Sequence, residues 1–349
     1  MSSKPSISGL PHGMPNPDAI FQSWWPIIIA LVGGLIYGLR QYFRGARCTS
    51  ATKLVGKVAV ITGGNGGIGK YIAEDFAKRG AKVYLACKDE KNGTEVANEL
   101  KKKTGNDKIV CLKCDLASFK SVQSFTDAFK KKEENLHFLI NNAGIMMHPQ
   151  LTTEDKFEIH FQVNYLGHAL LTHLLMATLK RSGPSRIVMT TAPAYQLAHI
   201  DLEDINWEQK EYNCAGLYAQ SKLACVLFTK EFARRSKLEE HGIAMNCVIP
   251  GVVRTGIHRH MPFRQSAFVA LTFAPFLWFL MKHSEDGAQT TIFCCLADAV
   301  TTVSSGFLYK ECKRELYSEN VNDEVAEQAQ QKLWDQTLSW LKVKEFGEE

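Results

Sequence analysis

The sequence contains no long block of like charges and no internal repeat in its main part. Charged residues make up 22% of its 349 residues, and the formal net charge is only +5. The two Lys-Lys-Lys runs, at 101–103 and 130–132, are typical of solvated helix faces and are not interleaved with aromatic residues. A nucleic-acid partner is therefore not predicted. The hydrophobic content of 45% instead indicates a globular protein with a sizeable core.

The sequence also lacks the residue spacings of a metal site or of a secreted disulfide scaffold. Its ten cysteines are scattered, mostly within apolar stretches, which favours free thiols in a reducing compartment. The one C-x-x-C pair, Cys111 and Cys114, lies in a strand-like run whose alternation points the two side chains to opposite faces. No two histidines have the H-x-x-x-H spacing, so no metal site is predicted.

The N-terminal part of the chain differs in composition from the rest. Residues 1–20 are rich in proline, glycine and serine, which predicts a disordered segment. Residues 21–43 form an apolar run, with sixteen uncharged residues from Trp24 to Leu39 and aromatic residues at both ends. A helix that continues to Phe43 is about 30 Å long, roughly the thickness of a bilayer core. The sequence therefore predicts a transmembrane anchor over residues 21–43.

A cleaved signal peptide is the alternative, and it would carry its basic residues before the apolar run. Here Lys4 precedes the uncharged stretch, whereas five basic residues follow Leu39: Arg40, Arg44, Arg47, Lys53 and Lys57. The positive-inside tendency then places the C-terminal domain in the cytosol. We predict a single-pass anchor in the endoplasmic reticulum membrane, with a mitochondrial membrane or a lipid droplet as the alternative. On this topology the sequon Asn92-Gly93-Thr94 stays unglycosylated.

Short runs rich in Val, Ile and Leu alternate with longer amphipathic stretches over residues 55–345. Seven runs have the character of buried strands: 57–63, 82–87, 109–116, 136–144, 186–191, 243–251 and 306–310. This alternation predicts a parallel sheet covered by helices on both faces. The predicted fold class is α/β, a single doubly wound domain of the Rossmann type behind the transmembrane helix. Ligands are expected at the carboxyl ends of its strands.

A glycine-rich turn links the first expected strand to the first expected helix of this domain. Gly63, Gly67 and Gly69 follow the pattern T-G-x-x-x-G-x-G, with Asn65 and Ile68 between them. Such glycines allow a tight turn and bring the backbone N–H groups of a helix N-terminus close to a pyrophosphate. These five residues are expected to bind a dinucleotide cofactor.

The end of the second expected strand indicates which dinucleotide is bound. An acidic residue there would accept hydrogen bonds from the ribose 2′-hydroxyl of NAD and repel a 2′-phosphate. The sequence has Cys87 and then Lys88, so the repulsion is removed and the lysine can pair with the phosphate. Asp89, the next residue, opposes this pairing. NADP(H) is the predicted cofactor.

Four further motifs follow in order: N-N-A-G at 141–144, V-N-Y-L-G around Asn164, Y-A-Q-S-K with Tyr218 and Lys222, and P-G-V-V-R-T ending at Thr255. With the glycine turn, they make the chain resemble short-chain dehydrogenases/reductases over about residues 55–345. The stretches V-N-Y-L-G-H-A-L-L and S-K-L-A-C-V-L-F-T are similar to the retinol-dehydrogenase-like microsomal group. A relative that acts on polyprenols also shares a stretch similar to Y-A-Q-S-K-L-A.

The resemblance implies a catalytic group around Tyr218. A phenol with a reference pKa near 10 is a poor proton donor or acceptor at neutral pH. Lys222 lies one helical turn away on the same face, where its ammonium would stabilise the phenolate. By resemblance, Lys222 also binds the nicotinamide ribose, and Asn164 holds a helix kink and a water of the proton relay. Three more residues contact the cofactor by the same resemblance: Asp115, Asn142 and Thr255.

One expected side chain is missing. The relatives carry N-[VL]-S-S-[LV]-A-H after the fifth strand, and the second serine polarises the substrate carbonyl. Ungapped alignment places Thr191 at the first serine and Ala192 at the second. Losing one such donor costs about 2.7–4 kcal/mol, or about 100- to 1,000-fold in rate. Three interpretations stay open: Thr191 supplies the hydroxyl, the enzyme is slow or needs less polarisation, or the protein binds NADP(H) and lipid without turnover.

Residues 261–288 form a second apolar stretch, in which 266–281 carry no charge. We interpret it as a substrate lid resting on the bilayer, with a second transmembrane helix and plain core packing as alternatives. The predicted function is NADP(H)-dependent interconversion of a lipophilic alcohol and carbonyl, such as a retinoid, polyprenoid or long-chain aldehyde. The alternative is a catalytically silent sensor or scaffold. The membrane is the expected partner besides the substrate, and a homodimer is allowed.

Overall fold

The computed structural model describes residues 24–236, 242–255, 281–297, 300 and 304–348. The chain divides into two compact units, Met1–Gly45 and Ala46–Glu349. The segment 1–20, predicted to be disordered, lies outside the described residues. In the first unit, helix α2 spans Trp25–Arg44 and is the one described helix long and apolar enough to cross a membrane. It overlaps the predicted anchor over 21–43, of which residues 21–23 lie outside the described residues.

The second unit is built around one sheet of eight strands in the order β3-β2-β1-β4-β5-β6-β7-β8. The strands are β1 Val58–Thr62, β2 Lys82–Cys87, β3 Ile109–Lys113, β4 Phe138–Asn141, β5 Ser185–Thr190, β6 Ile243–Ile249, β7 Leu308–Lys310 and β8 Lys313–Glu315. All neighbouring strands pair in parallel except β7 and β8, which form an antiparallel hairpin. The predicted parallel sheet is confirmed, and β8 is an addition that the sequence runs did not predict.

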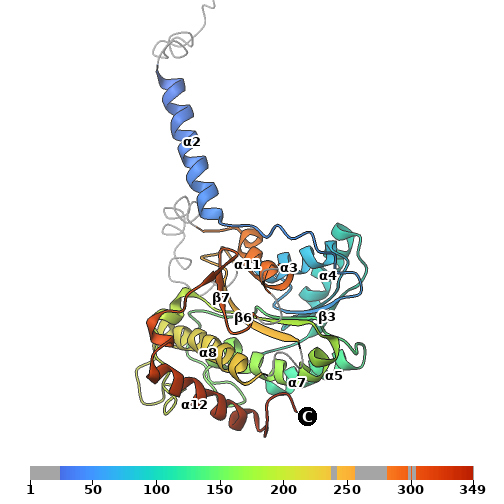
Figure 1. Ribbon diagram of the computed structural model, residues 1–349, viewed down its shortest axis with the longest axis vertical. Coiled ribbons are helices and arrows are strands. Elements are labelled where there is room, and N and C mark those ends of the chain that lie inside the picture. The colour runs from blue at the N-terminus through green and yellow to red at the C-terminus, as the bar shows by residue number, and fades with distance from the viewer. Residues whose placement is uncertain (1–23, 237–241, 256–280, 298–299, 301–303, 349) are drawn as a thin grey trace, which may run out of the picture. The chain divides into compact units, whose positions relative to one another are not determined.

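Helices cover both faces of this sheet (Figure 1). One layer consists of α3 Gly67–Lys78, α4 Glu90–Thr104 and α11 Ser284–Leu296. The other consists of α5 Phe119–Lys130, α7 Gly167–Ser182, α8 Cys214–Arg235 and α12 Glu324–Leu341. Short pieces complete the described elements: α6 Ile159–Phe161, the π-helical turn Gln162–Leu166, and the 3-10 turns Pro193–Leu197 and Glu319–Val321. The predicted doubly wound architecture is therefore confirmed.

Strand alternation distributes the apolar side chains between two cores. In β1, Val58 and Val60 face the core under α5, α7 and α8, whereas Ala59 and Ile61 face the core under α3, α4 and α11. This follows from the two-residue period of a strand. Apolar side chains therefore cover both faces of the sheet, so polar functional groups are expected at the carboxyl ends of the strands.

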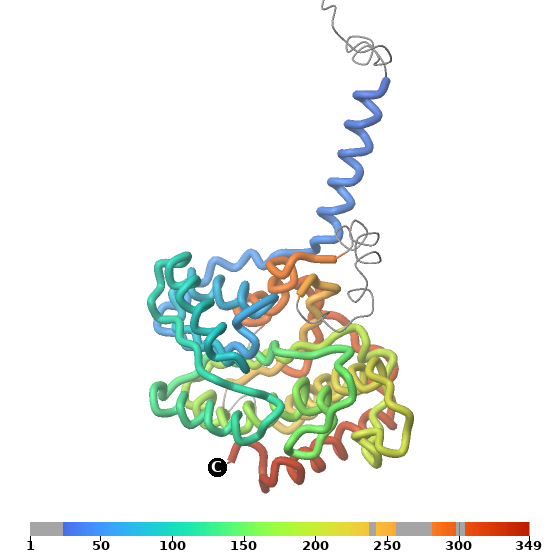
Figure 2. Tube along the Cα trace, turned by 180° about the vertical axis from the view of Figure 1, so that it is seen from behind, coloured from blue at the N-terminus to red at the C-terminus, as the bar shows by residue number. Residues whose placement is uncertain are grey.

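The C-terminal helix α12 packs along α8 (Figure 2). Asp323 caps its N-terminus by accepting a hydrogen bond from the backbone N–H of Ala326. Trp334 stacks on Phe228 of α8, with ring centroids 5.3 Å apart. Helix α8, which carries the expected catalytic residues, is therefore buried on both sides.

The chain is fixed to the second unit from Ala46 onward. The backbone N–H of Ala46 donates to Glu311, and Arg47 forms an ion pair with Asp286 at 3.0 Å. The backbone N–H of Cys48 donates to Gln289. Farther along, Arg79 donates to the carbonyl oxygens of residues 50 and 52. Residues 46–54 therefore belong to the compact unit, which begins before residue 55.

The predicted lid falls mostly outside the described residues, because 256–280 are not described. Its last part is described and differs from the prediction. Residues 284–288 begin helix α11, where Gly287 and Ala288 are buried and the helix packs on α3. Those residues form core rather than lid, because small side chains let the two helices approach closely.

Candidate functional site

The glycine turn after β1 brings the expected cofactor residues together. A Cβ added to Gly67, which has φ +51°, would lie 3.1 Å from Thr255 Cγ2. A Cβ added to Gly69 would lie 2.5 Å from the carbonyl oxygen of Gly63 and 2.8 Å from Asn142 Nδ2. Side chains at these positions would therefore collide with the turn itself or with its neighbours.

The start of helix α3 fits the pyrophosphate of a dinucleotide. Its N-cap is Gly66, which supplies no side-chain acceptor, and its first turn has no acidic residue. The N–H groups of this turn are left for an anion, which the helix dipole also favours. Asn65 donates to Asn92 Oδ1 of α4 at 2.8 Å, and Ile68 packs beside the core of that layer.

At the end of β2, the structure pairs two more expected cofactor residues. Lys88 Nζ lies 3.0 Å from Asp115 Oδ2, and the lysine side chain is 76% exposed. An exposed pair of this kind contributes little stability, so the lysine can leave it for a phosphate. Asp89 caps helix α4 by accepting a hydrogen bond from the backbone N–H of Asn92. Its carboxylate is therefore engaged at the start of α4.

A buried threonine and histidine, which the sequence did not single out for the site, hold the segment that contains Asn142. Thr62 Oγ1 accepts hydrogen bonds from the backbone N–H groups of Asn142 and Ala143, each at 2.9 Å. The same hydroxyl contacts His168 Nε2 at 2.9 Å, while His168 Nδ1 faces the carbonyl oxygen of Asn164 at 3.0 Å. Burial lowers the pKa of His168 to about 4, so the ring is neutral at physiological pH.

Helix α8 presents Tyr218 and Lys222 to the end of β5. Lys222 Nζ lies 5.9 Å from the centroid of the Tyr218 ring and donates to the carbonyl oxygen of Thr190 at 3.0 Å. Burial raises the pKa of the Tyr218 phenol and lowers the pKa of the Lys222 ammonium. The phenol is therefore protonated at neutral pH, and the lysine is held on the same side as the tyrosine ring.

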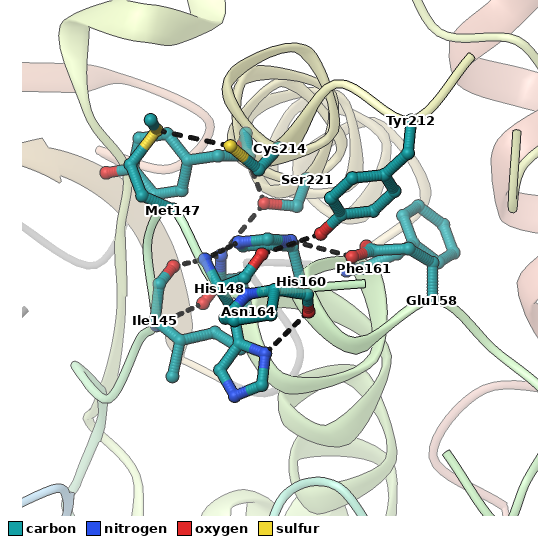
Figure 3. A network of polar contacts seen from close by, with 12 residues as sticks. Ile145, Met147, His148, Glu158, His160, Phe161, Asn164, Tyr212, Cys214 and Ser221 are labelled. Atoms are coloured by element: carbon teal, nitrogen blue, oxygen red, sulfur yellow. Dashed lines mark hydrogen bonds and ion pairs between the residues drawn. The ribbon is translucent and has the colours of Figure 1, made fainter. Parts of the chain in front are cut away.

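Asn164 lies in the π-helical turn between α6 and α7, which is the expected irregularity of this helix. Its Oδ1 accepts a hydrogen bond from the backbone N–H of Ile145 at 2.8 Å. Its Nδ2 donates to the Ile145 carbonyl at 3.0 Å and to Ser221 Oγ at 2.9 Å (Figure 3). Asn164 thus joins the segment after β4 to helix α8 next to Lys222.

The end of β5 carries no hydroxyl at the expected serine position. Ala192 is extended, with φ −146° and ψ 158°, and precedes a 3-10 turn that starts with Pro193. Thr191 Oγ1 donates to the backbone carbonyl of Lys222 at 2.9 Å. The threonine hydroxyl is therefore engaged with the backbone of α8.

A second polar group that the sequence did not reveal contains Glu158 and His160 (Figure 3). Glu158 and His160 form a buried pair, and His160 accepts a hydrogen bond from the backbone N–H of His148 at 3.0 Å. The His160 and Tyr218 rings meet edge to face, with centroids 6.4 Å apart. The signal in the sequence is a Glu-x-His spacing shortly before Asn164, which by itself resembles the polar start of a helix.

Comparison with known proteins identifies the family. The family model described as short chain dehydrogenase matches residues 57–264. Retinol dehydrogenase 13 of Mus musculus is 40% identical over 308 residues, which cover 88% of this chain and 90% of that protein. Retinol dehydrogenase 11 of Homo sapiens is 40% identical over 321 residues, which cover 91% of this chain and 97% of that protein.

Solved structures have the same fold. A protein of uncharacterised function from Mycobacterium Paratuberculosis superposes with a TM-score of 0.68 at 26% identity, covering 86% of this chain and 98% of that one. L-Sorbose reductase from Gluconobacter frateurii, complexed with NADPH and L-sorbose, gives a TM-score of 0.59 at 23% identity, covering 74% and 96%. The predicted fold, oxidoreductase class, nicotinamide cofactor and retinol-dehydrogenase-like group are confirmed at the level of the family. This chain belongs to the short-chain dehydrogenase family.

Proposed function

We propose that the protein is a membrane-anchored, NADP(H)-dependent oxidoreductase that interconverts a lipophilic alcohol and its carbonyl. The observation that carries this proposal is the convergence of Tyr218, Lys222 and Asn164 at the carboxyl ends of β4 and β5. The relatives named retinol dehydrogenases favour a retinoid, and polyprenoids and long-chain aldehydes share its chemistry. The exposed apolar helix α2 would keep the domain near such substrates.

Each residue of the group has a defined task in carbonyl reduction. NADP(H), when bound, supplies the hydride. Tyr218 donates its phenolic proton to the carbonyl oxygen, because burial keeps the phenol protonated. The Lys222 ammonium, held beside the tyrosine ring, stabilises the phenolate that remains. Asn164 keeps the segment from Ile145 in register with α8, so the proton donor and the substrate-side segment stay aligned.

The residues expected to hold the cofactor are on the segments that follow β1, β2, β3, β4 and β6. The glycine turn offers its uncapped helix N-terminus to the pyrophosphate, and Thr255 packs against Gly67. Asn142 is fixed by its Nδ2, which donates to the carbonyl oxygen of Thr62 at 3.0 Å. We propose that Lys88 leaves Asp115 to pair with the 2′-phosphate, which makes NADP(H) the preferred form.

A second candidate function is NADP(H) and lipid binding without turnover, as a sensor or scaffold. The observation that favours it is the apolar side chain of Ala192 together with the engaged hydroxyl of Thr191. The carbonyl of a substrate would then be polarised by Tyr218 alone. This second candidate has the same fold, cofactor and membrane anchor as the enzyme proposed first, and it differs from that enzyme only in having no turnover.

The proposed location is the endoplasmic reticulum membrane, with the domain on the cytosolic side and a mitochondrial membrane or lipid droplet as the alternative. It is supported by the basic residues after helix α2 and by ten free cysteines in the described chain. A homodimer completes the proposal. Analytical ultracentrifugation of the detergent-solubilised protein tests it by mass.

The enzyme proposal is tested with the purified full chain, NADPH and all-trans-retinal or decanal. We expect slow oxidation of NADPH that depends on the carbonyl compound and disappears in a Tyr218→Phe variant. NADPH binding, followed by fluorescence, is the matched control and should be retained by the variant. Equal background rates in the two proteins, with cofactor bound in both, would favour the silent candidate.

A further inference from the structure

A buried carboxylate–imidazole pair lies behind Tyr218 and has no part in the chemistry proposed above. Glu158 is 4% exposed and His160 is fully buried. Their Oε1 and Nδ1 atoms are 2.7 Å apart, and Glu158 Oε2 accepts a hydrogen bond from the backbone N–H of Phe161 at 2.9 Å. Both carboxylate oxygens therefore have partners, as a buried charge requires.

The contacts of His160 define its tautomer. The backbone N–H of His148 can only donate, so His160 Nε2 must accept this 3.0 Å hydrogen bond. The ring proton is then on Nδ1, where it donates to Glu158. The Glu158 carboxylate therefore stabilises the His160 tautomer with its proton on Nδ1, and in this tautomer Nε2 can accept a hydrogen bond from His148.

The segment from Ile145 to His148 is pinned at both ends by side chains from other elements. Asn164 binds the N–H and the carbonyl of Ile145. At the other end His160 binds the N–H of His148, and Tyr212 donates to its carbonyl at 2.7 Å (Figure 3).

Between the two pins the backbone is strained. Met147 has φ +53°, in the left-handed region that a bulky residue rarely adopts. Such a conformation persists only where surrounding contacts hold it. The Met147 sulfur lies 3.7 Å from the sulfur of Cys214 at the start of α8, which is one of those contacts.

This strained segment borders the reactive pair. A Cβ added to Gly144, just before it, would lie 3.4 Å from Lys222 Nζ and 3.2 Å from Asn164 Oδ1. Residues 145–147 are apolar and only half-buried, and His160, which binds the next residue, also contacts the Tyr218 ring. The segment thus presents apolar side chains next to the place where a carbonyl must approach Tyr218.

We propose that Glu158 and His160 are a positioning pair that holds residues 145–147 as an apolar wall beside Tyr218. The pair acts through the backbone N–H of His148 and keeps Met147 in its left-handed conformation. The wall would orient the chain of a lipophilic substrate, a role that rests on the function proposed above. Neither residue belongs to the Tyr218–Lys222–Asn164 group, which His160 meets through the edge-to-face contact with the Tyr218 ring.

The first test needs no turnover. Amide hydrogen exchange is measured by mass spectrometry on the full chain in detergent, for peptides that contain residues 145–149. In a His160→Phe variant, which keeps ring volume but loses the acceptor, we expect these amides to exchange about tenfold faster. His160→Gln keeps one acceptor and one donor and should restore most of the protection. Unchanged exchange in His160→Phe would overturn the proposal.

A second variant covers the case in which His160→Phe does not fold, as judged by lost NADPH binding. Glu158→Gln leaves the imidazole in place but removes the charge that selects its tautomer. We expect faster exchange of the same amides, with helix α12 unchanged as the internal reference. Faster exchange throughout the domain, rather than in this segment, would assign the pair a merely structural role.

The kinetic test uses the strain at Met147, in the wild type or, if turnover is too slow, in an Ala192→Ser background. His160→Phe should raise the KM for retinal at least about threefold with little change for propanal, which is too short to use the wall. Adding Met147→Gly should restore part of the lost exchange protection, because glycine adopts φ +53° without strain, but it should not restore the KM for retinal, because the Met147 side chain is part of the wall. Strictly additive effects would contradict the coupling. Absence of turnover in every background would count against the proposed function and leave the exchange result standing.

Discussion

The hydroxyl of Thr191 donates a 2.9 Å hydrogen bond to the backbone carbonyl of Lys222, the lysine that accompanies Tyr218. Thr191 is only 2% exposed, so turning its hydroxyl toward a substrate would leave a buried carbonyl without this partner. Thr191, the residue before Ala192, therefore joins α8 to the end of β5. Position 192 therefore has no hydrogen-bond donor for the substrate carbonyl, and for this reason we expect a low rate of carbonyl reduction.

Restoring the donor should raise turnover. An Ala192→Ser variant places a hydroxyl at the end of β5 without disturbing the Thr191 contact, and we expect a gain of about 100- to 1,000-fold in kcat/KM for retinal. NADPH oxidation at 340 nm is the measurement. An Ala192→Ser/Tyr218→Phe double variant is the control and should be inactive. A serine variant no faster than the wild type would show that the site does not bind the carbonyl at this position.

Cofactor preference should depend on Lys88. We expect Lys88→Ala to weaken NADPH binding about tenfold and to leave NADH binding unchanged, because only the 2′-phosphate gains from the lysine. Fluorescence titration of the full chain gives both affinities. Lys91→Ala is the matched control, because Lys91 is an exposed lysine in the first turn of α4. Equal NADPH affinity in the wild type and in Lys88→Ala would remove the basis for the NADP(H) assignment.

Stability should fall in mild acid because of His168. Its folded-state pKa of about 4 lies below the ordinary value of 6.5, so the unfolded chain binds more protons between these two pH values. Stability is therefore complete above pH 6.5 and is lost as the pH falls toward 4, by about 2 kcal/mol at pH 5. Urea unfolding in detergent, followed by tryptophan fluorescence at pH 7.5 and 5, measures the loss.

The His168→Gln variant isolates this contribution. Burial also lowers the pKa of His137, which contributes in the same direction and is present in both proteins. The variant should be less stable at pH 7.5, because Thr62 and Asn164 lose their imidazole partner, but its pH dependence should be shallower. Parallel pH profiles for the two proteins would show that His168 titrates normally.

The topology predicts an unmodified sequon. Asn92 is exposed on helix α4, so a lumenal domain would offer it to the glycosylation machinery. With the domain in the cytosol, glycosidase treatment of the protein from mammalian cells should leave its electrophoretic mobility unchanged. A Thr94→Ala variant should migrate identically to the wild type. A mobility shift that disappears in Thr94→Ala would reverse the proposed orientation.

The strands could be predicted because each is a short apolar run between turn signals, and all seven predicted runs contain a parallel strand. Strand β8 could not, because its Lys-Arg-Glu sequence is fully exposed and has no apolar alternation. It forms because it pairs with β7 across a two-residue turn, which is a tertiary cause. Likewise, composition alone does not separate an apolar lid from the buried start of α11 at Gly287 and Ala288.

In the site, residues within the family motifs could be predicted, whereas their partners could not. Tyr218 and Lys222 are recognisable by their Y-x-x-x-K spacing, and Asn164 by the resemblance of its V-N-Y-L-G motif to the family. Glu158 and His160 have no such spacing to them, and their importance appears only when His148, twelve residues before His160, folds back onto the imidazole. A strained backbone at Met147 is equally invisible in sequence, because it results from contacts at both ends of its segment.

The segment between Ala46 and Leu54 has a practical consequence for anyone producing the domain without its apolar helix. Side chains on distant elements hold this segment, among them Arg79, Asp286, Gln289 and Glu311. A recombinant protein that starts at residue 55 would leave those side chains without these hydrogen-bond partners. It would also expose the apolar surface that Cys48 contacts in the full chain. A shortened protein should therefore start after Gly45, where the first unit ends and before the first of these contacts.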